Sequence, residues 1–518
     1  TKRFPFYLFF EKKVLSLLLV VSIFTSLFAA CVNNSGSSTE KPSASSEVTL
    51  SPEEIAAALE EEAKAKEAAA LAEFKSTFYD NYQNENFDVN NIVLTFAAIS
   101  DLHIGLYQQT SKVEKGMQFL NRRTLNGLDA VLINGDLTNS YRASKDESQI
   151  ASVRDVLVNN LPQNTSFFYS LGTSHDADGF NTTINKSGKE QREAFIRVLG
   201  DRFSSADIED EKDLANGCKH AVIKDYHFLS LDNENGDYTN ASLKWLQNEL
   251  KKITTAEPNK TVFVMTHIPA SKSLNKVLKD FPQVIYFSAH EHIPFNTPVA
   301  ITQNSFTTLS IGGFAYYREE SVNSLSLQDN NNNYEYGQGY LIEVDKNGNT
   351  RALRLDFFNE TVIKESWVIP SPKSDKSHLE TYSSRKNYEK AVFAEDAQIV
   401  IDVDESNLFA PVKITFPAAK APDGQPVTMY NITIEISEGS GTSREETLNI
   451  SSLYMKYPNG IGMPESYSVT VDGVASPYSY TVTVKAYNCL GRVSSTLKGE
   501  LKTDGYNTIL GIKEENAA

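Results

Sequence analysis

Cysteine and tryptophan are scarce in this chain of 518 residues, which contains three of the first and two of the second. Three cysteines are too few for the disulfide framework that holds many small secreted domains together. Cys218 and Cys489 lie in segments that we expect to belong to different domains, so we predict that both are buried free thiols. The hydrophobic content of 40% is that of a globular protein with a sizeable core.

Basic residues are outnumbered, since 49 lysines and arginines face 66 aspartates and glutamates and the net charge is −17. Proteins that bind the nucleic-acid backbone need lysine and arginine to displace its counterions. We therefore expect no specific nucleic-acid binding. An anionic substrate could still bind locally, because metal cations within a site outweigh the charge of the surrounding surface.

An apolar run at residues 14–30 follows basic residues and ends in small residues immediately before Cys31. This layout resembles a bacterial lipoprotein signal with residues 27–31 as the lipobox, although Phe28 stands where that family usually has a small aliphatic residue. The resemblance implies a signal peptide at residues 1–30 and a lipid anchor that holds the exported protein to a membrane at the bacterial cell surface. An ordinary cleaved secretory signal and an uncleaved membrane anchor are the alternatives, and all three export the protein.

Residues 31–50 are rich in serine and asparagine and poor in residues that pack, which predicts a flexible tether. The sequence Ser51-Pro52-Glu53-Glu54 is a capping box with proline at the first helical position. It opens an Ala/Glu/Lys-rich helix that we predict over residues 51–82. Such a helix could hold a domain away from a surface or pack on the domain that follows it.

Between residues 91 and 370, short apolar strands alternate with amphipathic helical stretches, which is typical of an α/β fold. Towards the end of this segment strand follows strand, so we expect mixed sheets. Five of the eight histidines lie just after the strands, together with aspartates. Ligands of an open α/β sheet bind beyond the carboxyl ends of its strands, so we predict one polynuclear metal site there. Its candidate residues are Asp101, His103, Asp136, His175, Asp176, His267, His290 and His292.

The C-terminal part of the chain alternates polar and apolar residues in strand after strand, which predicts a β-sandwich. Tyr480 to Asn488 and the turn after them resemble the penultimate strand of a fibronectin type III domain. The tryptophan usual in that family is absent, since the two tryptophans are Trp245 and Trp367. The predicted ranges are a linker at 371–396, the sandwich at 397–505 and a tail at 506–518.

Aspartate and histidine together suit iron, manganese or zinc, because imidazole binds these metals well and a carboxylate can bridge two of them. Two metal ions roughly 3.5–4 Å apart can clamp a phosphoryl group and activate a water molecule. Phosphate esters gain much from such a site, because charge spreads over their equatorial oxygens. The residue types therefore favour metal-dependent hydrolysis of a phosphorylated substrate, without separating monoesters from diesters.

The order of these motifs along the chain resembles that of the calcineurin-like metallophosphoesterase superfamily. The resemblance covers residues 91 to about 365 and implies a four-layer α/β sandwich with mixed sheets. The motifs are Asp101-x-His103, Gly135-Asp136, Gly172-Thr173-Ser174-His175-Asp176, Thr266-His267 and His290-x-His292.

The resemblance assigns a role to each residue. Asp136 would bridge two metal ions, and His175 would protonate the leaving group or bind the phosphate, oriented by Asp176. The first ion would be held by Asp101, His103 and His292, and the second by His267, His290 and Ser174.

Two departures from the family pattern concern the second ion and the backbone. Ser174 stands where the family has an asparagine that binds the second metal, and Thr173 is an additional residue before it. A hydroxyl is a shorter and weaker ligand, so we expect a weakened second site. Ala289 replaces a glycine before His290, which matters only if the backbone there needs a positive φ.

The sequence therefore favours an exported, lipid-anchored phosphoesterase with two metal ions. One rival is a degenerate phosphoesterase that binds a surface partner without turnover, and another is an adhesin whose sandwich is the functional module. Tyr316, Tyr317 and Arg318 could reach the site as substrate contacts, but we expect them on a loop surface. Purple acid phosphatases carry a tyrosine where this chain has Asn139, so we set that subfamily aside. The sequence carries no indication of the oligomeric state.

Overall fold

The computed structural model describes most of the chain from residue 86 onwards. The predicted signal peptide, lipobox and tether lie outside the described residues, as do Thr173, Ser174 and the predicted tail from residue 506. Of the predicted N-terminal helix, Ala57, Glu61 and Ala65 are described, and they are helical. The described residues are 57, 61, 65, 86–124, 127–172, 175–177, 186–203, 217–232, 237–297, 299–317, 335–372, 377–379, 389–403, 411–421, 426–438, 441–452, 462–472 and 478–502.

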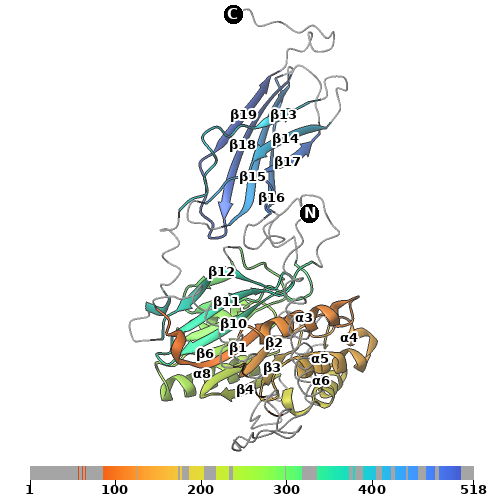
Figure 1. The fold of residues 1–518 in the computed structure, drawn as a ribbon, viewed down its shortest axis with the longest axis vertical. Helices are drawn as coiled ribbons and strands as arrows, with labels where there is room; N and C mark the ends of the chain where they lie inside the picture. Colours follow the sequence, from red (N-terminus) through yellow and green to blue (C-terminus); the bar gives the residue numbers. More distant parts are fainter. Residues whose placement is uncertain are drawn as a thin grey trace, which may run out of the picture. The chain divides into compact units, whose positions relative to one another are not determined.

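The first sheet has the strand order β12-β11-β10-β1-β2-β3 (Figure 1). Strands β1, β2 and β3 run parallel to one another, and β10, β11 and β12 add to the other edge of β1 in antiparallel fashion. The strands are β1 (Ile92–Ile99), β2 (Ala130–Asn134), β3 (Ser166–Ser170), β10 (Gln338–Asp345), β11 (Thr350–Asp356) and β12 (Thr361–Ile369).

The second sheet has the order β4-β5-β6-β7-β9-β8. Its four inner strands are parallel and its two edge strands are antiparallel. Both sheets are therefore mixed, as the sequence predicts. The strands are β4 (Cys218–Ile223), β5 (Tyr226–Leu231), β6 (Val262–Met265), β7 (Val284–Ser288), β8 (Ile301–Gln303) and β9 (Thr307–Ser310).

The two sheets pack face to face, and helices cover their outer faces. One hydrophobic cluster, which includes Phe96 and Phe287, lies between the sheets. A second joins the first sheet to α3 (Gln109–Asn121), α5 (Glu147–Asn160) and α6 (Lys186–Leu199). A third joins the second sheet to α8 (Asn240–Ala256) and α9 (Lys272–Leu278). Strands with both faces covered are apolar almost throughout, which explains why they appear in the sequence as continuous apolar runs. The four-layer α/β prediction is confirmed.

Two of the longer helices begin at a side chain that satisfies one of their first backbone N–H groups. Asp146 accepts a hydrogen bond from Ser148 N before α5, and Thr239 accepts one from Ser242 N before α8. Among the described residues, no helix combines the length and apolar character needed to cross a membrane. The helices are α3 (Gln109–Asn121), α4 (Tyr141–Ser144), α5 (Glu147–Asn160), α6 (Lys186–Leu199), α8 (Asn240–Ala256) and α9 (Lys272–Leu278), with 3-10 turns at Val89–Asn91, Asp201–Phe203 and Ser377–Leu379.

The C-terminal part folds into two further sheets, with the orders β13-β14-β17 and β16-β15-β18-β19. Their inward side chains form one hydrophobic cluster. After β18, the Asn488 side chain accepts hydrogen bonds from Leu490 N and Arg492 N and so shapes the turn that Gly491 completes at a φ of 74°. The all-β prediction is confirmed, whereas membership of the fibronectin type III family stays a prediction. The strands are β13 (Val400–Asp402), β14 (Val412–Pro417), β15 (Val427–Glu438), β16 (Ser443–Ser451), β17 (Ser466–Val471), β18 (Tyr478–Asn488) and β19 (Leu497–Lys502).

The two cysteines predicted to be free thiols, Cys218 at the start of β4 and Cys489 just after β18, are buried and form no disulfide. The proposed domain boundaries stay predictions.

Candidate metal centre

The loops that follow β1, β2, β6 and β7 meet at the carboxyl ends of these strands and carry the predicted ligands. His103 N donates to Asp136 O at 3.0 Å, which joins the loops after β1 and β2. Ala289 N donates to His267 O at 2.9 Å, which joins the loops after β6 and β7. Strands from both sheets therefore contribute to one site, as expected for parallel strands that end at the same edge.

The backbone at these loops is unusual. Five non-glycine residues of the centre have φ values between 46° and 70°, in the left-handed region. Such a conformation costs on the order of 1–3 kcal/mol per residue and is retained where a site requires it, and aspartate and histidine tolerate it better than most residues. Ala289 is not among the residues with positive φ, so its replacement of the family glycine is mild. The five residues are Asp101, His103, Asp136, His290 and His292.

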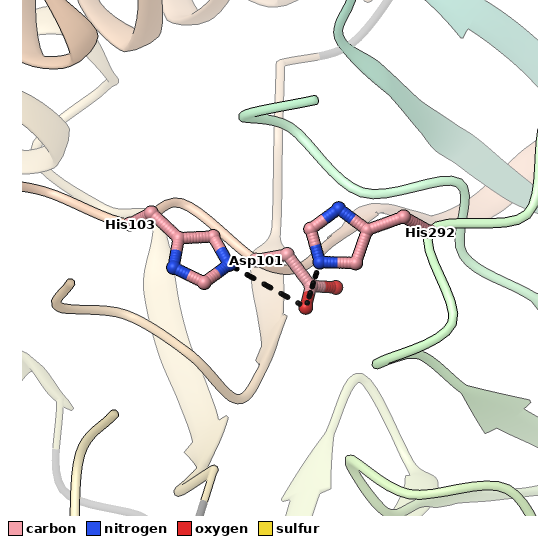
Figure 2. Close-up of side chains that lie close together, drawn as sticks. All are labelled: Asp101, His103 and His292. Atoms are coloured by element: carbon pink, nitrogen blue, oxygen red, sulfur yellow. Dashed lines mark ion pairs between the residues drawn. The ribbon is translucent and has the colours of Figure 1, made fainter. Parts of the chain in front are cut away.

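The first group of ligand atoms is formed by Asp101, His103 and His292, whose side chains converge in Figure 2. Asp101 Oδ1 lies 3.0 Å from His292 Nε2 and 4.0 Å from His103 Nε2. The other ring nitrogen of His292, Nδ1, lies 2.6 Å from the Tyr316 carbonyl oxygen and donates to it. That bond leaves the Nε2 lone pair of His292 directed at the group.

The second group is formed by Asp136, His267 and His290. His267 Nε2 lies 3.3 Å from Asp136 Oδ2 and 3.2 Å from His290 Nδ1. His267 Nδ1 donates to the carbonyl oxygen of Asn134 at 2.7 Å, which fixes the ring. Asp136 Oδ2 also lies 3.9 Å from His103 Nε2, so this carboxylate stands between the two groups.

The donor atoms of both groups fit metal ions. Among the described residues, Asp136 Oδ1 and both ring nitrogens of His103 are buried without a hydrogen-bond partner. Asp101 Oδ1 also accepts no hydrogen bond of good geometry, although it lies 3.0 Å from His292 Nε2. Buried polar atoms without partners are costly, and a cation bound between them would remove that cost. Carboxylate oxygens and imidazole nitrogens are a donor set for iron, manganese or zinc.

The pKa values of the histidines are consistent with this interpretation. Burial lowers the pKa of His103 to about 4 against the opposing effect of Asp136 and Asp101, so its ring is neutral at pH 7 and can bind a metal. Burial would also lower the pKa of His267, but the charge of Asp136 and a hydrogen bond to it raise that pKa to about 10. A metal cation beside Asp136 would take the place of the His267 proton.

His175 lies beside the Asp136 carboxylate and is more exposed than His103, His267 and His292. Its Nε2 lies 3.7 Å from Asp136 Oδ2, and 27% of its side chain is exposed. Its Nδ1 lies 2.5 Å from the carbonyl oxygen of Asn139 and donates to it. The ring is therefore oriented by a backbone carbonyl, with Nε2 directed into the site.

The expectation that Asp176 orients His175 is wrong. The buried Asp176 carboxylate accepts hydrogen bonds from the backbone N–H groups of Leu137, Thr138 and Gly172. The two residues are adjacent in sequence, yet their side chains have different partners, because His175 bonds to Asn139 O and Asp176 to the loop after β2. Asp176 therefore ties the loop after β2 to the loop after β3, and it acts on the site through the backbone that carries Asp136.

The expectation that Tyr316 lies on a loop surface is also wrong. Its ring stacks on that of His292 with centroids 4.2 Å apart, and it lies 5.2 Å from the ring of His103. Tyr317 lies further along, with its ring 5.4 Å from that of Tyr336. Tyr316 thus forms one wall of the first group.

Sequence reasoning missed Asn134, the last residue of β2. Its side chain donates to Thr266 O at 2.8 Å, and its Oδ1 accepts from Ser170 Oγ at 2.8 Å. Asn134 thereby links β2 to the loop of the other sheet that carries His267. A polar residue at the end of an apolar strand was the available signal.

The predicted site residues fall into two classes after this description. Seven of them are brought together at the centre, whereas the Asp176 carboxylate holds the backbone of the loop after β2. Their ligand and acid roles stay predictions. Ser174 lies outside the described residues, and the expected weakness of the second site stays a prediction.

Comparisons with known proteins support the same interpretation. The family model described as calcineurin-like phosphoesterase matches residues 94–294. No curated protein matches the sequence.

Three solved structures show only weak likeness to this chain. A purple acid phosphatase from yellow lupin (Lupinus luteus) is 11% identical with a TM-score of 0.37, and 55% of each chain is covered, so this chain spans about half of that enzyme. The twitchin kinase region of C. elegans is 17% identical over 23% of this chain and 17% of that one, with a TM-score of 0.14. A family 2 glycosyl hydrolase from Bacteroides cellulosilyticus is 10% identical over 80% and 61%, with a TM-score of 0.20.

The family match covers the strands and loops from β1 to His292, which supply every ligand predicted within the described residues. Residues 94–294 of this chain are therefore similar to the calcineurin-like phosphoesterase family, the family that the order of the motifs also resembles.

Proposed function

We propose that this protein is an exported, lipid-anchored phosphoesterase that hydrolyses phosphate monoesters or diesters with two bound metal ions. The observation that supports the proposal most is that two groups of possible ligands lie next to each other. The buried Asp136 carboxylate belongs to the second group and also lies 3.9 Å from His103 Nε2 of the first. One ion would be held by Asp101, His103 and His292, and the other by His267 and His290, with Asp136 shared.

When bound, such ions supply Lewis-acid polarisation of the phosphoryl oxygens and an activated water. The residues of the chain supply the remaining functions. His175 presents Nε2 near Asp136 and can hold a proton there for the departing oxygen, because Asn139 fixes the opposite ring nitrogen. Its partial exposure leaves room for a substrate to reach that nitrogen.

The rival proposal is a degenerate phosphoesterase that binds a ligand at the cell surface without turnover. The replacement of the family asparagine by Ser174 favours it. Metal analysis of the purified chain, combined with a panel of aryl phosphate monoesters and diesters, separates the two. The enzyme proposal expects two ions per chain and metal-dependent release of the aryl alcohol. Bound metal with no hydrolysis of any ester would favour the rival.

The proposed location depends on Cys31, which lies outside the described residues. Lipidation requires this thiol, so Cys31→Ser should leave an unprocessed or released protein in the expressing bacterium. Fractionation into membrane and soluble material measures the change. Unchanged membrane retention together with a cleaved signal would show that another anchor holds the protein.

A further inference from the structure

A lysine outside the metal centre contacts the segment that holds one of its ligands. Lys112 lies on α3, and its ammonium donates to the carbonyl oxygens of Ala315 and Tyr336, the second at 2.9 Å. These two residues are more than 200 positions away in the sequence. Lys112 is half-buried, and burial lowers the pKa of its ammonium to about 7.

Ala315 is held from both sides of its peptide group. Its N–H donates to the carbonyl oxygen of Asp101 at 3.0 Å, while its carbonyl accepts from Lys112. The preceding residue, Phe314, donates to Ser100 O at 2.9 Å. The segment after β9 is thus fastened along the loop that carries Asp101, and Lys112 closes this arrangement from the side of α3.

The next residue uses this fixed backbone to orient a ligand. The Tyr316 carbonyl accepts from His292 Nδ1, which fixes the tautomer that directs Nε2 at Asp101, and the Tyr316 ring stacks on the imidazole. Gly313 allows the close approach, since a Cβ there would lie 3.1 Å from His292 Nδ1 and its φ is 81°. A ligand held by an outer partner binds its metal more tightly, typically by 10–100-fold.

We propose that Lys112 is a positioning residue for the first metal site, and that it acts through Ala315 and the carbonyl and ring of Tyr316 on His292. The inference rests on the proposed function and specifies which outer residues that function needs. It concerns the group Asp101, His103 and His292, and not the group that contains His267.

The two sites can be measured separately by metal titration, without any hydrolysis assay. In a His290→Ala background the second site lacks a ligand, so zinc binding by chelator-treated protein reports the first site. In a His292→Ala background it reports the second. We expect Lys112→Gln to weaken zinc binding by about 10-fold or more in the first background and less than about twofold in the second. Lys115→Gln is the matched control, because Lys115 is exposed on the same helix.

A loss of folding would weaken both sites alike, so it is distinguished from positioning by the second background. Lys112→Arg retains a cationic donor and should recover most of the zinc affinity of the first site. Tyr316→Phe keeps the ring that stacks on His292, so it should bind zinc as the wild type does, whereas Tyr316→Leu should bind zinc more weakly. Equal effects of Lys112→Gln on both sites, or none on either, would overturn the proposal. If the wild-type chain binds no zinc at all, the proposed function itself fails. If the wild-type chain binds two zinc ions and Lys112→Gln changes neither affinity, only the proposal for Lys112 fails.

Discussion

Gly172 lies so close to Asp136 that a Cβ atom on it would be 1.9 Å from Asp136 Oδ1 and 2.7 Å from Asp136 N. The requirement for glycine is therefore steric. The loop after β3 packs directly on the carboxylate that stands between the two ligand groups, and any side chain at position 172 would displace it.

Gly172→Ala should accordingly disturb both metal ions, because the displaced Asp136 belongs to both sites in our assignment. We expect at least a 10-fold loss of metal affinity, measured by titration of the chelator-treated protein with zinc. Gly127→Ala is the control. Gly127 has a φ of 84°, and a Cβ atom on it would have no other atom within 4 Å, so its substitution brings backbone strain of about 1 kcal/mol without touching the centre.

Removing the charge of Asp136 tests its bridging role directly. Asp136→Asn should strip both ions and abolish hydrolysis, because an amide is a poor substitute for a shared carboxylate. Asp129→Asn should leave both ions in place, since Asp129 accepts from Thr95 N and takes no part in the ligand groups. Metal content by elemental analysis is the measurement, and two ions retained in Asp136→Asn would contradict the assignment.

The sequence predicted which residues meet at the centre, because the end of a buried strand is visible as an apolar run followed by Asp or His. It could not predict how they are oriented. His175 and Asp176 are neighbours, yet one bonds to Asn139 and the other to the loop after β2. Tyr316 was misjudged for the same reason, because its contact with His292 depends on how the segment after β9 is placed against β1. Periodicity carries no information on such contacts between distant segments.

His175 should contribute to turnover and not to metal binding. His175→Asn removes the proton that Nε2 could give to the leaving oxygen, so we expect turnover to fall by about 10²–10⁴-fold with alkyl phosphates and less with nitrophenyl phosphates, whose leaving groups need no acid. Metal content should not change. Loss of an ion in this variant would instead make His175 a ligand, as its place beside His103 and Asp136 also allows.

The buried carboxyl group of Asp356 should make stability depend on pH. Burial raises its pKa from 3.8 to about 6, against hydrogen bonds from Asn359. The folded state therefore holds this proton more tightly than the unfolded state, so stability falls as pH rises from about 4 to about 6 and stays reduced above that range. Asp356→Asn does not titrate, and its stability relative to the wild type should increase by about 1–3 kcal/mol between pH 4 and pH 7.

The two tryptophans, Trp245 and Trp367, lie in α8 and β12, so their fluorescence follows unfolding of the part that contains Asp356. Asp155→Asn is the control, because 56% of the Asp155 side chain is exposed. An equal difference between Asp356→Asn and the wild type at both pH values would contradict the prediction.

We expect Ser174 to determine how firmly a second ion is held. If the family's amide ligand has been lost here, that ion depends on Asp136, His267 and His290, and it should be the first to leave on dilution or chelation. Ser174→Asn, best combined with deletion of Thr173 to restore the family's spacing, should tighten the second ion and raise turnover, by about 10–100-fold if the new oxygen is well placed. Titration with a competing chelator measures the change, and Ser144→Asn, on the short helix α4, is a control for added amide groups elsewhere. The contrary outcome is that the wild-type chain holds two ions tightly while the variant loses activity. In that case Thr173, Ser174 or another residue supplies the ligand of the second ion, and the expected weakness of that site is wrong.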